Sequence, residues 1–287
     1  MRDDRIETGL REALSLAETG APPRLAAALW HSVFPGGARL RPRLALAAAA
    51  ACGNRHPALA LGSAVAIELL HCASLVHDDL PCFDDGQVRR GRPSVQAAFG
   101  EALAVLAGDA LIVLAFETLA RSGVRSPSRM VELIGLVGRA VGMPGGITAG
   151  QAWECEPFVE LSEYHRAKTG VLFAAATAAG GAAGGGDAGA WWLLGERLGE
   201  AYQVADDIRD VAADPAELGK PVGRDKVLGR RSAVAELGLE GALDRFDALL
   251  GEAAAAIPAC PGRAALETLI VAESRRFVPK TVARVAA

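Results

Sequence analysis

Two clusters of aspartates contain the residue types in this chain that are best suited to chemistry. The first is the run DDLPCFDD at residues 78–85, and the second is DDIRD at residues 206–210. Each follows an apolar, helix-like stretch, 67–76 and 201–205, where a charge is costly to remove from water without a partner. Mg²⁺ binds hard oxygen ligands, usually one or two carboxylates per ion together with substrate phosphates. The two clusters together predict a paired Mg²⁺–diphosphate site, whereas a helix cap or an exposed charge run is the alternative for either cluster alone.

The second cluster has helical spacing. Asp206 and Asp210 are four residues apart, and Gln203 lies three residues before Asp206. Residues three or four apart share one face of a helix, so we expect these three side chains on one face. Two carboxylates placed in this way repel each other by roughly 0.2–0.5 kcal/mol unless a cation lies between them.

The first cluster is expected to begin on a helix and continue on a loop. Ser74 and His71 lie four and seven residues before Asp78, which places all three on one helical face. Pro81 cannot continue a helix and disfavours the helical conformation of the residue before it. We therefore expect the aspartates at 84–85 on a loop that curls back over the end of the helix.

Basic residues follow glycines or the first aspartate cluster at several places. Arginine is suited to bidentate phosphate recognition, and lysine supplies a point charge. Surface ion pairs that contribute little to stability are the alternative for any one of them. In chain order the residues are Arg39, Arg41, Arg89, Arg90, Arg92, Lys168 and Lys220.

The sequence of these motifs resembles the trans-isoprenyl diphosphate synthases, from about residue 30 to about residue 245. A single DDxxD motif is only moderately specific because terpene cyclases also contain one, but five motifs in the same order are highly specific. The matching segments are 36–42, 77–94, 168–170, 202–210 and 219–230.

The resemblance implies a reaction and a set of binding residues. The reaction is head-to-tail prenyl transfer, in which an allylic diphosphate loses its diphosphate and the double bond of isopentenyl diphosphate attacks the resulting cation. The expected Mg²⁺ ligands, for about three ions as in the family, are Asp78, Asp79, Asp84, Asp206, Asp207 and Asp210. The expected contacts to the allylic diphosphate are Arg89, Lys168 and Lys220, and those to isopentenyl diphosphate are Arg41, His71 and Arg90. Thr169 and Gln203 would place dipoles near the cation, and Gln151 with Glu154 matches a Gln-x-x-Asp pair of the family.

The chain departs from the family pattern in three places. Ala38 stands where lysine is usual, which removes one contact to isopentenyl diphosphate. A charge-assisted hydrogen bond contributes about 1.5–3 kcal/mol, so that site is expected to be weaker unless Arg39 compensates. Gly86 and Gln87 stand where family members often have acidic residues. Arg230 stands where they commonly have lysine, and the positive charge is kept.

The residues just before Asp78 bear on product length, because the growing chain is expected to run past them. Ala73 and Ser74 are small, whereas family members that stop at fifteen carbons commonly have an aromatic residue at one of these positions. With the two-residue insertion 81–82, this pattern resembles the synthases that make geranylgeranyl diphosphate, a C20 product. Simple helix packing is the alternative for both residues, and Leu70 or Phe116 could limit the chain elsewhere, which leaves farnesyl diphosphate, C15, as a second product.

Two other functions fit parts of the pattern. A terpene cyclase also uses a DDxxD motif and Mg²⁺, but it needs no site for isopentenyl diphosphate and has a different second metal motif. A non-catalytic partner subunit of another synthase typically loses one carboxylate cluster, whereas both are intact in this chain.

Composition and periodicity predict an all-α fold that spans 1–287 as one domain. The family resemblance implies that it is a single large helical bundle of the isoprenoid synthase type with a central cavity. Apolar residues make up 51% of the chain but aromatic residues only 5%, so an Ala, Leu and Val core of closely packed helices is expected. The Gly/Ala run at 174–186 is interpreted as the tail of a helix entering a loop. Helical periodicity is clearest over 59–76, 103–119, 130–141 and 191–211.

Location and partners follow from features that the sequence lacks. The charged start at residues 1–5 has no apolar signal region, and we expect no membrane span and a cytoplasmic protein. A net charge of −4 argues against nucleic acid as a partner. The family resemblance implies a homodimer. Five scattered cysteines suggest free thiols; they are Cys52, Cys72, Cys82, Cys155 and Cys260.

Overall fold

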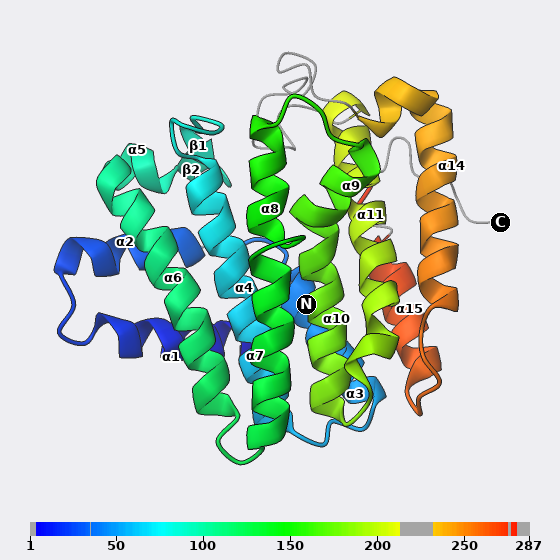
Figure 1. Cartoon of the computed structure of the whole chain (residues 1–287), viewed down its shortest axis with the longest axis horizontal. Coiled ribbons are helices and arrows are strands. Elements are labelled where there is room, and N and C mark those ends of the chain that lie inside the picture. Colours follow the sequence, from blue (N-terminus) through cyan, green and yellow to red (C-terminus); the bar gives the residue numbers. More distant parts are fainter. Residues whose placement is uncertain (1–3, 35, 213–231, 275–276, 280–287) are drawn as a thin grey trace. The chain divides into compact units, whose positions relative to one another are not determined.

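The computed structural model describes residues 4–34, 36–212, 232–274 and 277–279 (Figure 1). The chain divides into two compact units, one formed by 1–138 with 179–186 and the other by 139–178 with 187–287. Each unit contains one of the two aspartate clusters. The expectation of a single domain over 1–287 stays a prediction.

The first unit is helical apart from one short hairpin. Its helices are α1 (Asp4–Glu18), α2 (Pro23–Val33), α3 (Leu40–Ala51), α4 (Pro57–Asp78), α5 (Val95–Phe99), α6 (Glu101–Ser122) and most of α7 (Pro127–Val141). The hairpin strands β1 (Val88–Arg89) and β2 (Arg92–Pro93) form the one sheet in the part of the chain that the structure describes.

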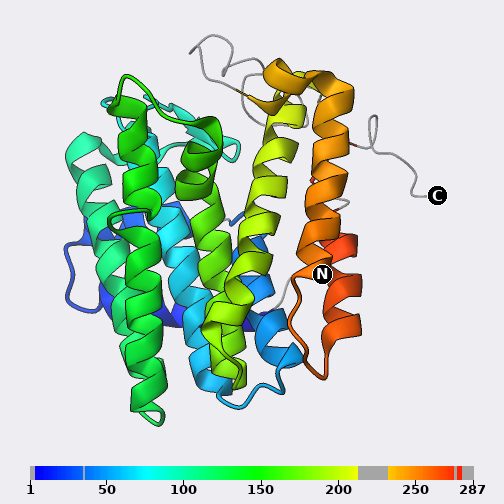
Figure 2. The ribbon, with the colours of Figure 1, turned by 45° about the vertical axis from the view of Figure 1, so that its right-hand side comes forward.

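The helices α4 and α6 lie side by side and antiparallel along their whole length (Figures 1 and 2). Small residues permit this close approach at both ends. A Cβ added to Gly62 of α4 would overlap the side chain of Ser122, and one added to Gly108 of α6 would overlap the ring of His77. His77 immediately precedes the first aspartate cluster, so the packing of α6 fixes the end of α4 from which that cluster begins.

An alanine-rich helix, α10 (Val171–Gly184), is buried along almost all of its length. Its last residues belong to the first unit, where a Cβ at Gly180 would overlap the carbonyl of Ala45 in α3. The helix ends at Gly184 and is followed by Gly185, whose φ of 102° suits glycine. The predicted helix tail entering a loop is therefore confirmed, and small side chains let these backbones pack closely as expected.

The second unit is built around the long helix α11 (Ala188–Ala212), which packs against α14 (Ala233–Ala255) (Figure 2). An aromatic cluster lies beside it, with the Tyr202 ring 5.3 Å from the rings of both Phe173 and Phe277. The remaining elements of this unit are α8 (Ile147–Ala152), the 3₁₀ turn η1 (Trp153–Cys155), α9 (Leu161–His165), the π-helical turn η2 (Arg166–Gly170) and α15 (Arg263–Ser274).

The predicted all-α fold is confirmed, and each of the four segments with clear helical periodicity lies in a helix: α4, α6, α7 and α11. Two described helices, α4 and α6, are long and apolar enough to cross a membrane by length and composition. The apolar window of α4 is 78% buried, as in the core helix of a globular protein, whereas that of α6 is 39% buried. The expected absence of a membrane span therefore stays a prediction.

Candidate active site

The first aspartate cluster caps the end of α4, as the position of Pro81 predicted. The helix ends at Asp78, and the chain then turns back over it. The backbone N–H of Asp84 donates to the carbonyl of Asp78 over 3.0 Å, and the N–H of Gly86 donates to the carbonyl of Asp79 over 3.0 Å. These bonds bring Asp78 and Asp84 together although six residues separate them in sequence.

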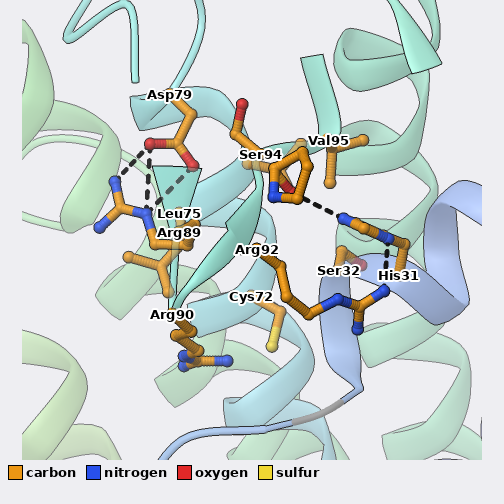
Figure 3. Close-up of a pocket in the computed structure, with 12 residues that line it drawn as sticks. His31, Ser32, Cys72, Leu75, Asp79, Arg89, Arg90, Arg92, Ser94 and Val95 are labelled. Atoms are coloured by element: carbon orange, nitrogen blue, oxygen red, sulfur yellow. Dashed lines mark hydrogen bonds and ion pairs between the residues drawn. The ribbon is translucent and has the colours of Figure 1, made fainter. Parts of the chain in front are cut away.

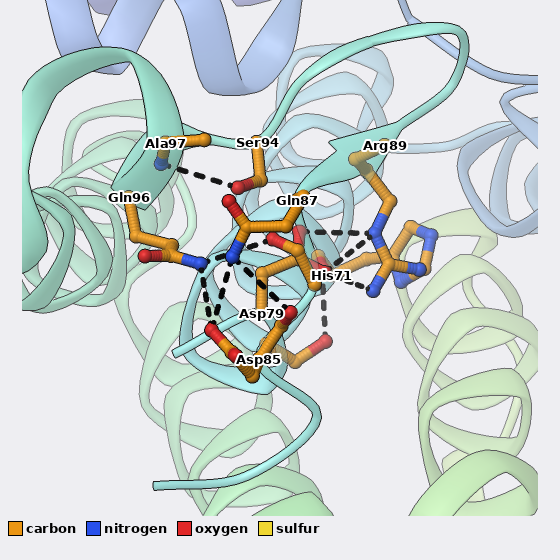
Figure 4. Close-up of polar contacts among 10 residues, drawn as sticks. His71, Asp79, Asp85, Gln87, Arg89, Ser94, Gln96 and Ala97 are labelled. Atoms are coloured by element: carbon orange, nitrogen blue, oxygen red, sulfur yellow. Dashed lines mark hydrogen bonds and ion pairs between the residues drawn. The ribbon is translucent and has the colours of Figure 1, made fainter. Parts of the chain in front are cut away.

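Gly86 allows this loop to close on the buried carboxyl group of Asp79. A Cβ at position 86 would overlap the Asp79 carboxylate. This overlap is a steric reason for glycine at a position where the family often has an acidic residue. The neighbouring amides steady the loop (Figure 4): Gln87 donates to the Asp85 carboxylate over 3.0 Å, and Gln96 donates to the carbonyl of Gly86 over 3.2 Å. The two positions that depart from the family pattern thus have structural partners within the loop.

The β1–β2 hairpin presents the paired arginines. Its turn consists of Arg90 and Gly91, with φ angles of 53° and 73°, the left-handed pair that matches the twist of a two-residue hairpin. Arg89 donates from Nε to Asp79 Oδ2 over 3.0 Å and from a terminal nitrogen to Oδ1 over 2.5 Å. Burial lowers the pKa of Arg89, but the hydrogen bond and charge of Asp79 outweigh it and raise the pKa above its usual value. Arg89, a predicted contact to the allylic diphosphate, is therefore paired with Asp79, a predicted metal ligand.

The three residues expected to bind isopentenyl diphosphate gather in the first unit. The pKa of His71 lies well below its usual value, first because of burial and then because of the nearby charges of Arg41 and Arg90. A Cβ at Gly37 would lie 3.1–3.2 Å from the Arg90 guanidinium, so the glycine turn packs directly against this arginine. Residues from the start of α3, the middle of α4 and the hairpin turn thus form one cationic cluster.

Arg39, the residue that could have compensated for Ala38, is held by two carboxylates in the first unit. Its side chain is buried, 5% exposed, and its guanidinium donates to Glu7 over 2.9 Å, to Glu68 over 2.7 Å and to the carbonyl of Val33 over 2.9 Å. Burial lowers its pKa, but these carboxylates raise it above its usual value overall. Because two carboxylates occupy its guanidinium, Arg39 holds α1 and α4 together and does not replace the lysine that is usual at position 38.

In the second unit, Lys168 is held in place by Glu154. The ammonium group pairs with Glu154 Oε1, which also accepts from the Tyr164 hydroxyl over 2.5 Å, and Gln151 donates to Oε2 over 2.9 Å. The lysine lies on the π-helical turn η2, and π turns often occur at functional sites. The predicted Gln151–Glu154 pair is thus brought to the predicted diphosphate-binding lysine.

A chain of hydrogen bonds joins Thr169 to the second aspartate cluster. The Thr169 hydroxyl donates to Gln203 over 3.0 Å, and the Gln203 amide donates to Asp207 Oδ1 over 3.2 Å. The other oxygen of Asp207 accepts from the backbone N–H of Ala233 over 2.7 Å, at the start of α14. Asp207 is 3% exposed, so this placement favours an anchoring role for it over the metal-binding role expected from the resemblance.

The other two carboxylates of that cluster lie on α11 as the spacing predicted. Asp206 accepts from Arg209 over 2.7 Å, and Asp210 is buried. Lys220 and Arg230 lie outside the described residues, so their roles stay predictions.

The donor set fits Mg²⁺ that is bound jointly with a phosphate. Among residues 4–34, 36–212, 232–274 and 277–279, no group of three or more His, Cys, Asp or Glu side chains converges to hold a metal by itself. Asp78 and Asp84 are partly exposed residues, with Asp78 Oδ1 buried, and Mg²⁺ commonly takes one or two carboxylates and completes its shell with substrate oxygens and water.

The product-length residues lie one turn before this cluster on α4. Ala73 is buried, 1% exposed, while Ser74 is partly exposed and its hydroxyl donates to the carbonyl of His71 over 2.8 Å. The role of both residues in product length stays a prediction.

Sequence reasoning missed several residues that shape the site: Glu7, Glu68, Tyr164 and His31. Tyr164 and Glu68 had a local signal, because Tyr164 lies four residues before Lys168 and Glu68 lies three residues before His71. Glu7 and His31 lie on the distant helices α1 and α2, and a lone carboxylate or histidine on a helix does not indicate its partner.

Together, an all-α fold, two carboxylate clusters and a cationic cluster beside one of them define the class of helical enzymes that use metal ions and diphosphate substrates. The polyprenyl synthetase family model matches residues 22–260. The chain therefore belongs to the polyprenyl synthetase family, and it is a trans-prenyltransferase.

Three comparisons illustrate the similarity. The chain is 51% identical to a geranylgeranyl diphosphate synthase of Cereibacter sphaeroides, over 98% of both chains. It is 38% identical to a farnesyl diphosphate synthase of Geobacillus stearothermophilus, over 84% of both. The crystal structure of a geranyltransferase from Helicobacter pylori, complexed with magnesium and isoprenyl diphosphate, has a TM-score of 0.78 and 30% identity, covering 95% of this chain and 98% of that one.

Proposed function

We propose that this protein is a Mg²⁺-dependent synthase that condenses isopentenyl diphosphate with an allylic diphosphate to give geranylgeranyl diphosphate. The observation that carries the proposal is the convergence of Arg41, His71 and Arg90 in the unit that contains the first aspartate cluster. A cationic cluster separate from the metal-binding carboxylates is what a second diphosphate substrate requires. A terpene cyclase, which consumes one prenyl diphosphate alone, has no use for it.

The lowered pKa of His71 gives that cluster a specific chemistry. Because the neighbouring arginines and burial lower its pKa, the imidazole is neutral at pH 7. A neutral ring can donate one hydrogen bond to a diphosphate without adding charge, while Arg41 and Arg90 supply the two positive charges.

The allylic diphosphate is bound by Arg89, Lys168 and Lys220 in this proposal, together with Mg²⁺ held by Asp78, Asp84, Asp206 and Asp210. Magnesium, when bound, neutralises the charge that develops on the leaving diphosphate as the C–O bond breaks. In the structure Asp79 holds Arg89, and Glu154 holds Lys168, so both cations are positioned before substrate binds. The Thr169–Gln203 pair presents oxygen dipoles that would stabilise the allylic cation.

The C20 product is supported by the small residues Ala73 and Ser74 one turn before Asp78. It is also supported by the similarity to the Cereibacter sphaeroides enzyme over nearly the whole chain. A C15 product is the second candidate, favoured by the similarity to the Geobacillus stearothermophilus farnesyl diphosphate synthase.

A cytoplasmic homodimer completes the proposal. The helix α6 exposes Leu106 and Val113, which are 51% and 58% exposed and seven residues apart, hence on one face. An exposed apolar face on a helix that is only partly buried suits contact with a second copy of the chain. The alternative is that α6 spans a membrane. Measuring how the purified protein partitions between detergent-free buffer and vesicles distinguishes a dimer contact from a membrane span.

The decisive experiment is product analysis with purified protein, Mg²⁺, labelled isopentenyl diphosphate and dimethylallyl, geranyl or farnesyl diphosphate in turn. A dominant C20 product is expected with each primer. A dominant C15 product would support the proposed prenyl transfer and reject the proposed C20 chain length. The absence of elongation with every primer would reject the proposed function. Addition of EDTA should abolish elongation, and excess Mg²⁺ should restore it.

A further inference from the structure

The β1–β2 hairpin needs an external anchor. Each strand has two residues, and a two-stranded ribbon is at best marginally stable in water without further packing. Yet this ribbon carries Arg89 and, at its turn, Arg90, whose placement decides whether diphosphates can be bound. Something outside the ribbon must therefore fix its position.

The Asp79–Arg89 pair holds β1, and the helix α2 supplies a second anchor, on β2, through His31 (Figure 3). A terminal nitrogen of Arg92 lies 2.9 Å from His31 Nδ1, and the other terminal nitrogen donates to the carbonyl of Phe34 over 2.7 Å. On the opposite side of the ring, Nε2 lies 2.8 Å from the carbonyl of Pro93. Both ring nitrogens of one histidine thus bind the two residues of β2.

The partners fix the protonation state of the ring. Arginine can only donate hydrogen bonds, so Nδ1 must accept, and a carbonyl can only accept, so Nε2 must carry the proton. His31 is therefore neutral when these contacts form. The edge of its ring also packs on Phe99, with the ring centres 5.3 Å apart, which limits its rotation.

The register of the hairpin shows why a neutral partner matters. Arg89 and Arg92 are directly opposite each other, and like charges in that position are destabilising. Arg89 is drawn to Asp79, whereas Arg92 is drawn to α2. Within the described ranges no carboxylate forms an ion pair with Arg92, so its charge is held in place without being cancelled.

We propose that His31 is a positioning residue for both diphosphate sites. It holds β2 against α2, and β2 in turn fixes the strand and turn that present Arg89 and Arg90. The inference rests on the proposed function for the identity of the substrates, but its mechanical part concerns the hairpin alone.

The test compares His31→Ala, His31→Asn and a matched control, His56→Ala. His56 belongs to the same unit and also uses a ring nitrogen for one contact, with the Ser126 hydroxyl over 2.9 Å, at the other end of α4. The measurements are hydrogen–deuterium exchange of residues 88–93, the KM for each substrate, kcat, and the melting temperature. Exchange does not depend on turnover and can be read even in the absence of activity.

We expect His31→Ala to speed exchange over 88–93 and to raise both KM values about five- to tenfold, as the loss of one or two hydrogen bonds implies, with kcat within about twofold. His31→Asn should recover most of the KM, because its side-chain oxygen can accept from Arg92. The control should lower the melting temperature comparably and leave both KM values and this exchange unchanged.

The inference is overturned if His31→Ala folds and either the exchange of 88–93 or both KM values stay at wild-type levels. Should that variant not fold, Arg92→Met removes the contacts of this arginine with His31 Nδ1 and with the Phe34 carbonyl, leaves the contact of His31 with Pro93, and is judged by the same two readouts. Failure of the wild-type protein to elongate any primer would reject the proposed function instead, and the exchange result would still decide the role of His31.

Discussion

Asp79 and Arg89 form a bidentate pair in which the aspartate is almost fully buried, with N–O distances of 3.0 and 2.5 Å. The aspartate is the C-terminal cap of α4, and the arginine is the last residue of β1. This pair ties the hairpin to the end of α4, while in the rest of the first cluster Asp78 and Asp84 are partly exposed and Asp85 is exposed.

The first prediction concerns this pair. Arg89→Ala should lower the free energy of unfolding by about 1–3 kcal/mol, because a buried carboxylate is left without its main partner. It should also raise the KM for the allylic diphosphate. Urea denaturation and steady-state kinetics measure the two effects. Arg89→Lys should recover part of the charge but not the two parallel hydrogen bonds. A variant with wild-type stability would contradict the assigned partnership.

The second prediction concerns Glu154, which binds Lys168 and the Tyr164 hydroxyl. Glu154→Gln should reduce kcat/KM for the allylic substrate about 10- to 100-fold, because loss of one charge-assisted hydrogen bond corresponds to about 1.5–3 kcal/mol. Tyr164→Phe removes a neutral donor and should have a smaller effect. Equal effects of the two substitutions would show that the charge of Glu154 does not position the lysine.

The third prediction concerns the packing of α4 on α6. Gly108→Ala should destabilise the fold by about 1–3 kcal/mol, because the new methyl group would overlap the His77 ring and neither helix can easily move. Gly138→Ala, on α7, is the matched control. Nothing lies within 4 Å of its added Cβ, so it should stabilise the protein by about 0.4–1 kcal/mol. Thermal melts should show a lower melting temperature for Gly108→Ala and a higher one for Gly138→Ala than for the wild-type protein.

The fourth prediction concerns acid stability. Burial lowers the pKa of His165 from 6.5 to about 4. The unfolded chain binds this proton below about pH 6.5 while the folded protein does not, so stability present above pH 6.5 is lost as the pH falls toward 4. At pH 5 the buried, neutral His165 should lower the free energy of unfolding by about 2 kcal/mol relative to its value above pH 6.5. His165→Gln should flatten the pH dependence of unfolding between pH 4 and 6.5, and an unchanged slope would place the acid sensitivity elsewhere.

The fifth prediction concerns product length. Ala73→Tyr should shift the main product from C20 to C15, because the added ring would block the path beyond Asp78. Since Ala73 is buried, the melting temperature of the variant must be measured alongside its products. A folded variant that still makes mainly C20 product would show that the chain is limited at another position, such as Leu70 or Phe116.

The sequence by itself determined the helices and the chemistry of each motif. Helical periodicity placed α4, α6, α7 and α11, because an amphipathic or buried helix repeats its apolar residues every three to four positions. The loop at 84–85 was equally predictable, since Pro81 must end the helix within a few residues. Local rules of this kind depend only on near neighbours along the chain, and those neighbours are known before any folding is considered.

The tertiary structure decided which partners each of these side chains has. Arg39 and Arg41 are two residues apart and equally basic in sequence, yet one is buried between Glu7 and Glu68 while the other joins the cluster at His71. His31 had no pattern of its own and gained a partner only when β2 was brought against α2. Partners of this kind come from distant segments, so they exist only after helices without any sequence relationship have packed together.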